Sequence, residues 1–129
     1  MSNTVPADLR YTNDHEWLRE GPSASAVGIT QFAVDQLGDI TLVDLPRQGD
    51  LVTKGQRFGT IESVKSVSDL YAPVSGRVAA VNAALKDAPE AVNSDPYTAG
   101  WMIDLEPSEK SEIDELMDAA AYTKHVASQ

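Results

Sequence analysis

Short apolar segments of about five residues recur along the chain, each bounded by Gly, Pro, Asp or Asn. Segments of this length with such boundaries are typical of β-strands. In the last of them, alternation places Trp101, Ile103 and Leu105 on one face. Met102 and Asp104 would face the other side. The pattern predicts a mainly β domain with strands at Ala26–Ile29, Ile40–Leu45, Phe58–Glu62, Val67–Tyr71, Arg77–Val81 and Trp101–Leu105.

Two helices interrupt this strand pattern. Thr30 can cap a short helix over Gln31–Leu37, and Gly38 can supply the left-handed residue that ends it. A longer helix is expected after Pro107, with Ser108 as its N-cap and one apolar face docked on the sheet. That apolar face comprises Ile113, Leu116, Met117 and Ala120.

The length of 129 residues fits a single domain over residues 1–129, because one domain usually has about 100 to 200 residues. Within this domain we expect residues 1–10 to form an N-terminal extension. We also expect residues 123–129 to form a mobile tail, because chain ends fray unless they are held in the fold.

The acidic composition narrows the classes of partner. Ten Lys and Arg residues against 20 Asp and Glu residues give a formal net charge of −10, so the surface would repel a nucleic acid. No apolar run approaches the about 18 residues of a membrane span, and the first residues contain no secretory segment. We therefore expect no nucleic-acid or membrane partner and a cytoplasmic location, or the mitochondrial matrix for a eukaryotic chain whose transit peptide has been removed.

No motif for metal binding or catalysis stands out. The absence of Cys excludes thiolate zinc sites, iron–sulfur clusters held by the protein and a cysteine nucleophile. The two histidines, His15 and His125, lie at opposite ends of the chain, and no phosphate-binding glycine loop is present. An enzyme with its own active site is therefore the weakest interpretation, and no metal site is expected.

One lysine has an unusual predicted position. Two strand-like runs flank Ser63 to Ser66, and this hairpin arrangement would lift Lys65 to the tip of a turn. A rigid hairpin tip suits a lysine that must enter another enzyme's active site, be acylated there and then carry a cargo. On position alone, an ordinary exposed lysine remains the more common case.

The residues around this lysine resemble a known segment. Glu62-Ser-Val-Lys65-Ser, followed by Ser68-Asp69 and Ala72-Pro-Val-Ser-Gly76-Arg-Val, is similar to the lipoyl-lysine segment of the H-protein family of the glycine cleavage system. Further motifs of that family occur in the same order. They are Tyr11-Thr-Asn-Asp-His-Glu-Trp17, Val27-Gly-Ile-Thr30, Leu37-Gly-Asp-Ile40, Leu45-Pro46 and Val92-Asn-Ser-Asp-Pro-Tyr-Thr-Ala-Gly-Trp-Met102.

This resemblance implies a lipoyl- or biotinyl-like flattened barrel-sandwich of two small antiparallel sheets, with short helices and a C-terminal helix. It also implies a non-catalytic carrier, expected to be a monomer, with lipoic acid amide-linked to Lys65. The arm would take the aminomethyl group of glycine from a pyridoxal-phosphate glycine decarboxylase to a tetrahydrofolate-dependent aminomethyltransferase. It would pass electrons to a dihydrolipoyl dehydrogenase that uses FAD and NAD. A lipoate ligase, or a lipoyl or octanoyl transferase, would attach the cofactor.

The resemblance also assigns roles to the residues near the arm. Glu62 matches an acid that presents the lysine to the lipoylating enzyme. His15, Glu16 and Asp69 match residues of a cleft that shelters the loaded arm from water, together with Asp14. For Glu16, a charge-assisted hydrogen bond to the cargo amine is the expected contact. Plain packing or capping of the first strand is an equal alternative for His15 and Glu16.

Other carriers and other classes of protein remain to be weighed. A biotinyl domain usually presents its lysine between two methionines, whereas Val64 and Ser66 flank Lys65 here. Lipoyl domains of 2-oxo acid dehydrogenases are usually shorter and lack the motifs around Trp17 and Trp101. A homologue that relays lipoate to other proteins without serving glycine cleavage is the alternative that the sequence leaves open.

Overall fold

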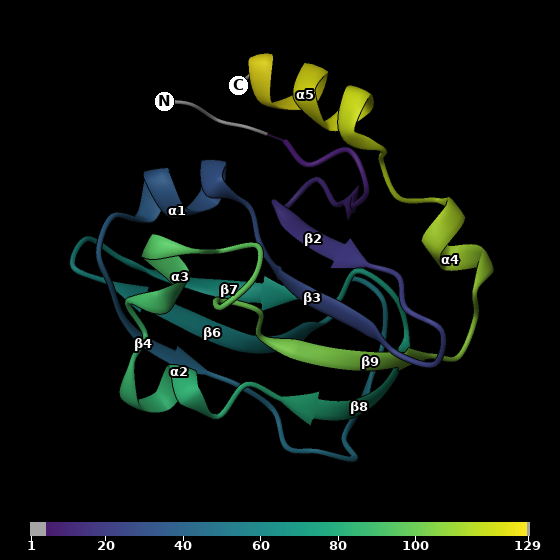
Figure 1. The fold of residues 1–129 in the computed structure, drawn as a ribbon, viewed down its shortest axis with the longest axis horizontal. Coiled ribbons are helices and arrows are strands. Elements are labelled where there is room, and N and C mark those ends of the chain that lie inside the picture. Colours follow the sequence, from purple (N-terminus) through teal and green to yellow (C-terminus); the bar gives the residue numbers. More distant parts are fainter. Residues whose placement is uncertain (1–4, 129) are drawn as a thin grey trace.

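The computed structural model describes residues 5–128, whose strands form two antiparallel sheets (Figure 1). The larger sheet has the order β1-β2-β3-β9-β8-β5, and the smaller sheet has the order β4-β6-β7. The predicted mainly β fold with two antiparallel sheets is therefore confirmed. In chain order the strands are Arg10–Tyr11, Glu16–Arg19, Ser25–Ile29, Ile40–Asp44, Leu51–Val52, Arg57–Ser63, Val67–Tyr71, Gly76–Val81 and Ile103–Pro107.

The main hydrophobic core gathers apolar residues from both sheets. Val27 and Leu105 of the larger sheet belong to it, as do Val43, Ile61 and Leu70 of the smaller sheet, all almost completely buried. Removing this apolar surface from water is the main favourable term in folding. The shared core also holds the smaller sheet, which carries the hairpin around Lys65, against the larger sheet.

Five of the six strands predicted from the sequence are confirmed within one residue at each end. The sixth is shifted, because β9 begins at Ile103 rather than at Trp101. The Trp101 amide donates to the Thr98 carbonyl at 3.2 Å within a turn. Met102 is fully buried, so the alternation predicted for this segment does not extend to its first two residues.

The short helix predicted from the sequence is also confirmed. Helix α1 spans Gln31–Leu37, and the Thr30 hydroxyl accepts from the Ala33 amide. Gly38 ends the helix with φ of 80° and ψ of −152°, a conformation essentially open only to glycine. The sequence did not predict α2 (Ala84–Asp87) or α3 (Ala91–Ser94), because a single helical turn is too short to show a 3.6-residue period.

The long helix predicted after Pro107 is wrong. The segment forms two helices instead, α4 at Ser111–Asp114 and α5 at Ala119–Ala127. Met117 interrupts them because its backbone pairs with that of Tyr11 through hydrogen bonds of 2.8 and 2.9 Å. The predicted Ser108 N-cap is wrong as well; Asp118 begins the longer helix and accepts from the Ala121 amide at 2.8 Å.

The chain ends join the fold more closely than the sequence predicts. Residues 123–127 are helical and continue α5, where the sequence predicts a tail from residue 123. At the other end, Leu9 is 2% exposed and Arg10 begins β1, so the expected extension 1–10 already belongs to the fold at these residues. Residues 1–4 and 129 lie outside the described residues.

A second, smaller core holds α5. It contains the buried residues Leu9, Tyr11, Trp17 and Tyr122. Tyr122 of α5 stacks on Tyr11 of β1, with ring centroids 4.5 Å apart. Figure 1 shows α5 at the periphery, at the same end of the molecule as α1. In the part of the chain that the structure describes, no helix has the length and apolar character to cross a membrane.

We predict that Asp118→Ala lowers the free energy of unfolding by about 1 kcal/mol, because the first turn of α5 loses its side-chain cap. Urea denaturation followed by circular dichroism measures the change. Asp114→Ala is the control, because it removes an exposed carboxylate from α4 rather than a cap. Equal losses in the two variants would contradict the assignment of this cap.

Candidate functional site

Lys65 lies at the tip of the β6–β7 hairpin, as predicted from the sequence. The Ser63 amide donates to the Ser66 carbonyl at 2.8 Å and closes the turn. The Ser63 hydroxyl oxygen accepts from the amides of Lys65 and Ser66, each at 3.2 Å. These bonds fix the backbone of the turn, while the Lys65 side chain is exposed.

The hairpin tip also contacts the end of α1. The Val64 amide donates to the Asp39 carbonyl at 3.0 Å, which ties the turn to the segment after that helix. A Cβ atom added to Gly38 would lie 3.4 Å from the Lys65 Cε atom, so the lysine stem passes over this glycine. Val64 and Val67 beside the lysine are 67% and 65% exposed.

Glu62 lies on the outer face of the smaller sheet. It pairs with Leu42 of β4 and Val67 of β7, and directly opposed residues share a face. Both neighbours are exposed apolar residues, and Glu62 itself is half-buried. The structure therefore separates Glu62 from His15 and Glu16 and leaves it accessible beside the lysine hairpin.

The remaining predicted residues line one pocket of about 130 Å³, here called the α1 pocket. It lies between α1, the free edge of β7 and the Thr12–Glu16 loop. His15, Glu16 and Asp69 all line it, as does Asp14. Its apolar wall comprises Ile29, Ala33, Leu37, Ile61 and Leu70.

The α1 pocket also lies close to the lysine. Leu37, one of its lining residues, directly precedes Gly38, over which the Lys65 stem passes. Asp69 follows Lys65 by four residues and lies within β7. The pocket therefore offers apolar surface close to the lysine, and carboxyl groups from β7 and from the Thr12–Glu16 loop.

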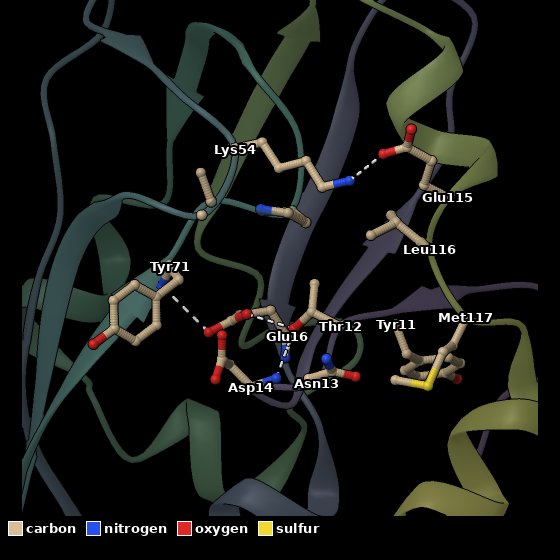
Figure 2. Close-up of a pocket in the computed structure, with 13 residues that line it drawn as sticks. Tyr11, Thr12, Asn13, Asp14, Glu16, Lys54, Tyr71, Glu115, Leu116 and Met117 are labelled. Carbon is tan, nitrogen blue, oxygen red and sulfur yellow. Dashed lines mark hydrogen bonds and ion pairs between the residues drawn. The ribbon is translucent and has the colours of Figure 1, made fainter.

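Glu16 is the most buried carboxyl group of this site, with 2% of its surface exposed. The Thr12 hydroxyl donates to Oε1 at 2.6 Å, and the Tyr71 amide donates to Oε2 at 3.2 Å (Figure 2). β7 is the edge strand of the smaller sheet, so no neighbouring strand accepts a hydrogen bond from the Tyr71 amide on this side. Glu16 accepts it instead. Burial raises the pKa of Glu16 to about 8, although both hydrogen bonds oppose the shift.

A second pocket of about 230 Å³, here called the Lys54 pocket, also has Asp14 and Glu16 among its lining residues. Figure 2 shows this pocket, in which Nζ of Lys54 lies 2.5 Å from Glu115 Oε1. Because Glu16 lines both pockets, it forms part of the wall between them.

Thr12 organises this wall, and the sequence analysis did not identify it. Besides its bond to Glu16, its hydroxyl oxygen accepts from the amides of Asp14 at 3.2 Å and Glu16 at 3.1 Å. The bond from the Asp14 amide, two residues after Thr12, is that of an ST turn. Ser and Thr form such turns readily before a polar segment. That turn pattern was the available signal in the sequence.

Asp69 is exposed and has two polar neighbours. Its Oδ1 lies 3.8 Å from Nη1 of Arg57, and its Oδ2 accepts from the Tyr71 hydroxyl at 3.4 Å. The negative charge of Asp69 raises the pKa of the Tyr71 hydroxyl. These contacts leave the Asp69 carboxylate on the outer face of the smaller sheet, at the rim of the α1 pocket. In residues 5–128, no group of three or more His, Asp or Glu side chains is arranged to hold a metal ion.

The family model described as "Glycine cleavage H-protein" matches residues 9–129. The chain belongs to this family. The glycine cleavage system H protein of Anaeromyxobacter sp. strain K is 56% identical over 125 residues, which cover 97% of this chain and 98% of the relative. A probable glycine cleavage system H protein of Haloarcula marismortui is 51% identical, with coverage of 98% and 99%.

A solved structure of the H-protein family agrees with the fold. The crystal structure of a glycine cleavage system H protein from Mycobacterium marinum matches with a TM-score of 0.89 at 40% identity. The match covers 95% of this chain and 99% of that chain. The resemblance inferred from the separated sequence motifs is thereby confirmed over almost the full length, as is the predicted lipoyl-like fold.

We predict that Glu16 makes stability fall as the pH rises. Its pKa is about 8 in the folded chain and near its ordinary value of 4.5 when unfolded. Between these values the folded state binds a proton that the unfolded state has released, so the free energy of unfolding decreases with increasing pH. This contribution is fully present below about pH 4.5 and is lost as the pH rises through about 8.

Urea denaturation at about pH 6 and about pH 9 measures this effect. Glu16→Gln removes the titrating group and should show a smaller decrease than the wild type between the two pH values. Glu20→Gln is the control, because Glu20 is exposed. Parallel pH dependences in the wild type and Glu16→Gln would show that burial does not raise this pKa.

Proposed function

We propose that this chain is the lipoyl-bearing carrier of a glycine cleavage system, with lipoic acid attached to Lys65. Membership of the H-protein family makes it a carrier component rather than a catalyst. The assignment of the attachment site rests on the position of Lys65. Its side chain is exposed at the tip of a hairpin whose backbone is fixed by hydrogen bonds.

The hairpin suits covalent attachment by a second enzyme. The exposed amine of Lys65 is open to acylation, while Ser63 keeps the turn in one conformation during that encounter. Glu62, Val64 and Val67 surround it with one acidic and two exposed apolar side chains. We assign these three to recognition by the attaching enzyme, a lipoate ligase or a lipoyl or octanoyl transferase.

The α1 pocket suits the arm itself. Its apolar wall matches the hydrocarbon part of a lipoyl chain, and its carboxyl groups match a cationic group at the end of that chain. The lysine stem passes over Gly38, whose neighbour Leu37 lines this pocket, so the pocket lies close to the point of attachment of the arm. We therefore propose that the α1 pocket shelters the loaded arm from water.

When attached, lipoate supplies a disulfide ring that can be reduced and can carry a one-carbon group between enzymes. By the proposal, the carrier takes the aminomethyl group of glycine from a glycine decarboxylase to an aminomethyltransferase. It then delivers electrons to a dihydrolipoyl dehydrogenase. We expect it to act as a monomer in the cytoplasm. The chain has no Cys that could exchange with the lipoyl disulfide.

The carboxyl groups of the pocket have different proposed tasks. Asp69 is exposed and can meet an ammonium group directly. Glu16 is buried, and its raised pKa of about 8 favours the protonated form near neutral pH. An ammonium group beside it favours the ionised carboxylate and lowers that pKa. Glu16 would then release its proton to solvent as the cargo ammonium group enters.

We predict that Lys65 is the sole lipoylation site. Lys65→Arg should abolish incorporation by a lipoate ligase, because the guanidinium group is not acylated in its place. In the wild-type chain, modification removes one positive charge and takes the formal net charge from −10 to −11. Intact mass and peptide mapping measure incorporation. Lys86→Arg, at an exposed lysine of α2, should incorporate normally, and label retained by Lys65→Arg would overturn the assignment.

A second prediction concerns the protection of the cargo. Glu16→Gln keeps the size of the side chain but cannot ionise, so the charge-assisted bond to the cargo amine is lost. We expect lipoylation to be unchanged and the release of ammonia and formaldehyde from the loaded carrier to accelerate by about ten- to a hundredfold, since such bonds contribute about 1.5–3 kcal/mol. Glu20→Gln is the control. An unchanged release rate in folded, fully loaded Glu16→Gln would leave Glu16 with a structural role alone.

A further inference from the structure

His15 has a strained backbone next to the α1 pocket. Its φ is 71°, the one positive value among non-glycine residues in the described part of the chain. A residue in this left-handed region is uncommon and persists where its surroundings hold it. The reversal of the chain at His15 lets Asp14, on the exposed loop, and Glu16, at the start of β2, line the same pocket.

Helix α5 supplies the side chain that holds His15. The Tyr122 hydroxyl lies 2.8 Å from Nδ1 of His15 and 2.7 Å from Oγ1 of Thr30, within hydrogen-bond distance of both. Tyr122 is 1% exposed, and burial raises its pKa to about 12, so the hydroxyl keeps its proton. The Thr30 amide in turn donates to the His15 carbonyl at 2.9 Å.

A second residue of α5 contacts the same loop. Nε2 of His125 donates to the Asn13 carbonyl at 3.2 Å. The His125 ring also lies against the His15 ring, with centroids 5.6 Å apart. Contacts from two successive turns of α5 therefore fall on neighbouring residues of the Thr12–Glu16 loop, more than 100 positions away in the sequence.

We propose that α5 is a positioning element for the α1 pocket, and that the Tyr122 hydroxyl fixes His15 so that Asp14 and Glu16 face the cargo. This inference rests on the proposed function of the pocket. Tyr122 acts through His15 and does not line the α1 pocket itself. Helix α5 packs on β1 of the larger sheet, whereas Lys65 lies on a hairpin of the smaller sheet. By this proposal α5 nevertheless controls how well the carrier protects its cargo.

Tyr122→Phe tests this role because it keeps the ring that stacks on Tyr11 and removes the hydroxyl alone. The matched control is Tyr97→Phe. The Tyr97 hydroxyl accepts from the Gln31 amide at 2.9 Å, so this variant loses a similar bond, to α1 rather than to the Thr12–Glu16 loop. Both variants are prepared as the full chain and compared in unmodified, lipoylated and loaded forms.

In the unmodified chain, amide hydrogen exchange of Asp14, His15 and Glu16 should accelerate in Tyr122→Phe by about two- to tenfold, the range expected for one lost hydrogen bond. Tyr97→Phe should leave these three amides unchanged. In the loaded chain, Tyr122→Phe should release ammonia and formaldehyde faster than Tyr97→Phe. Lipoylation of Lys65 should be equal in both variants. Unchanged exchange of the three amides in Tyr122→Phe would overturn the proposal.

A double-mutant cycle shows whether Tyr122 acts through His15. His15→Asn removes the imidazole, and Asn tolerates the left-handed conformation. In that background the additional change Tyr122→Phe should have little further effect on exchange of the Asp14 and Glu16 amides. Full additivity of the two changes would contradict the proposed route.

The same measurements separate this inference from the proposed function. Faster cargo release in Glu16→Gln but not in Tyr122→Phe would overturn the role of α5 and leave the pocket as the shelter. Faster loop exchange in Tyr122→Phe, with cargo release unchanged in both variants, would overturn the sheltering function, and with it the role of α5 in cargo protection.

Discussion

A buried carboxyl group joins the two sheets at the point where this carrier needs a cleft. Glu16 begins β2 of the larger sheet, and its Oε2 accepts from the Tyr71 amide on the free edge of β7. An edge strand leaves such amides without a strand partner, and burying one without any partner would be costly. Thr12 completes the arrangement by donating to Oε1. The position of the α1 pocket therefore depends on a hydrogen-bonded carboxyl group as well as on apolar packing.

This arrangement has an electrostatic consequence. Burial disfavours a charge on Glu16 and raises its pKa to about 8. A cation beside this carboxyl group would reverse the preference. Asp69 lies exposed at the edge of the same pocket. The pocket thus combines an exposed carboxyl group with a buried one whose ionisation depends on what lies beside it.

The sequence predicted the parts of the fold that rest on local patterns. Thr30 and Gly38 marked the ends of α1 because capping and left-handed residues have strong local preferences. The Lys65 hairpin followed from two strand-like runs around a short turn. The helix after Pro107 was wrong because a long-range backbone pairing, between Met117 and Tyr11, interrupts a segment that is locally compatible with a helix.

The site residues also divide into those that a local sequence pattern identified and those that depend on contacts between distant parts of the chain. Lys65, Glu62 and Asp69 lie on one hairpin, so a single stretch of sequence identified them. Thr12 was not identified, although it stands within a family motif, because its role depends on how its hydroxyl folds back onto Glu16. Tyr122 could not be predicted, since no local pattern connects it with His15, 107 residues away.

We propose that the arm on Lys65 lies in the α1 pocket when it carries cargo. A crystal structure of the chain after lipoylation and loading by glycine decarboxylase tests this position most directly. We expect electron density that leaves Lys65, passes Gly38 and ends between Asp69 and Glu16. An ordered arm on another face of the protein, or a loaded arm without density in crystals whose lattice leaves the pocket open, would contradict it.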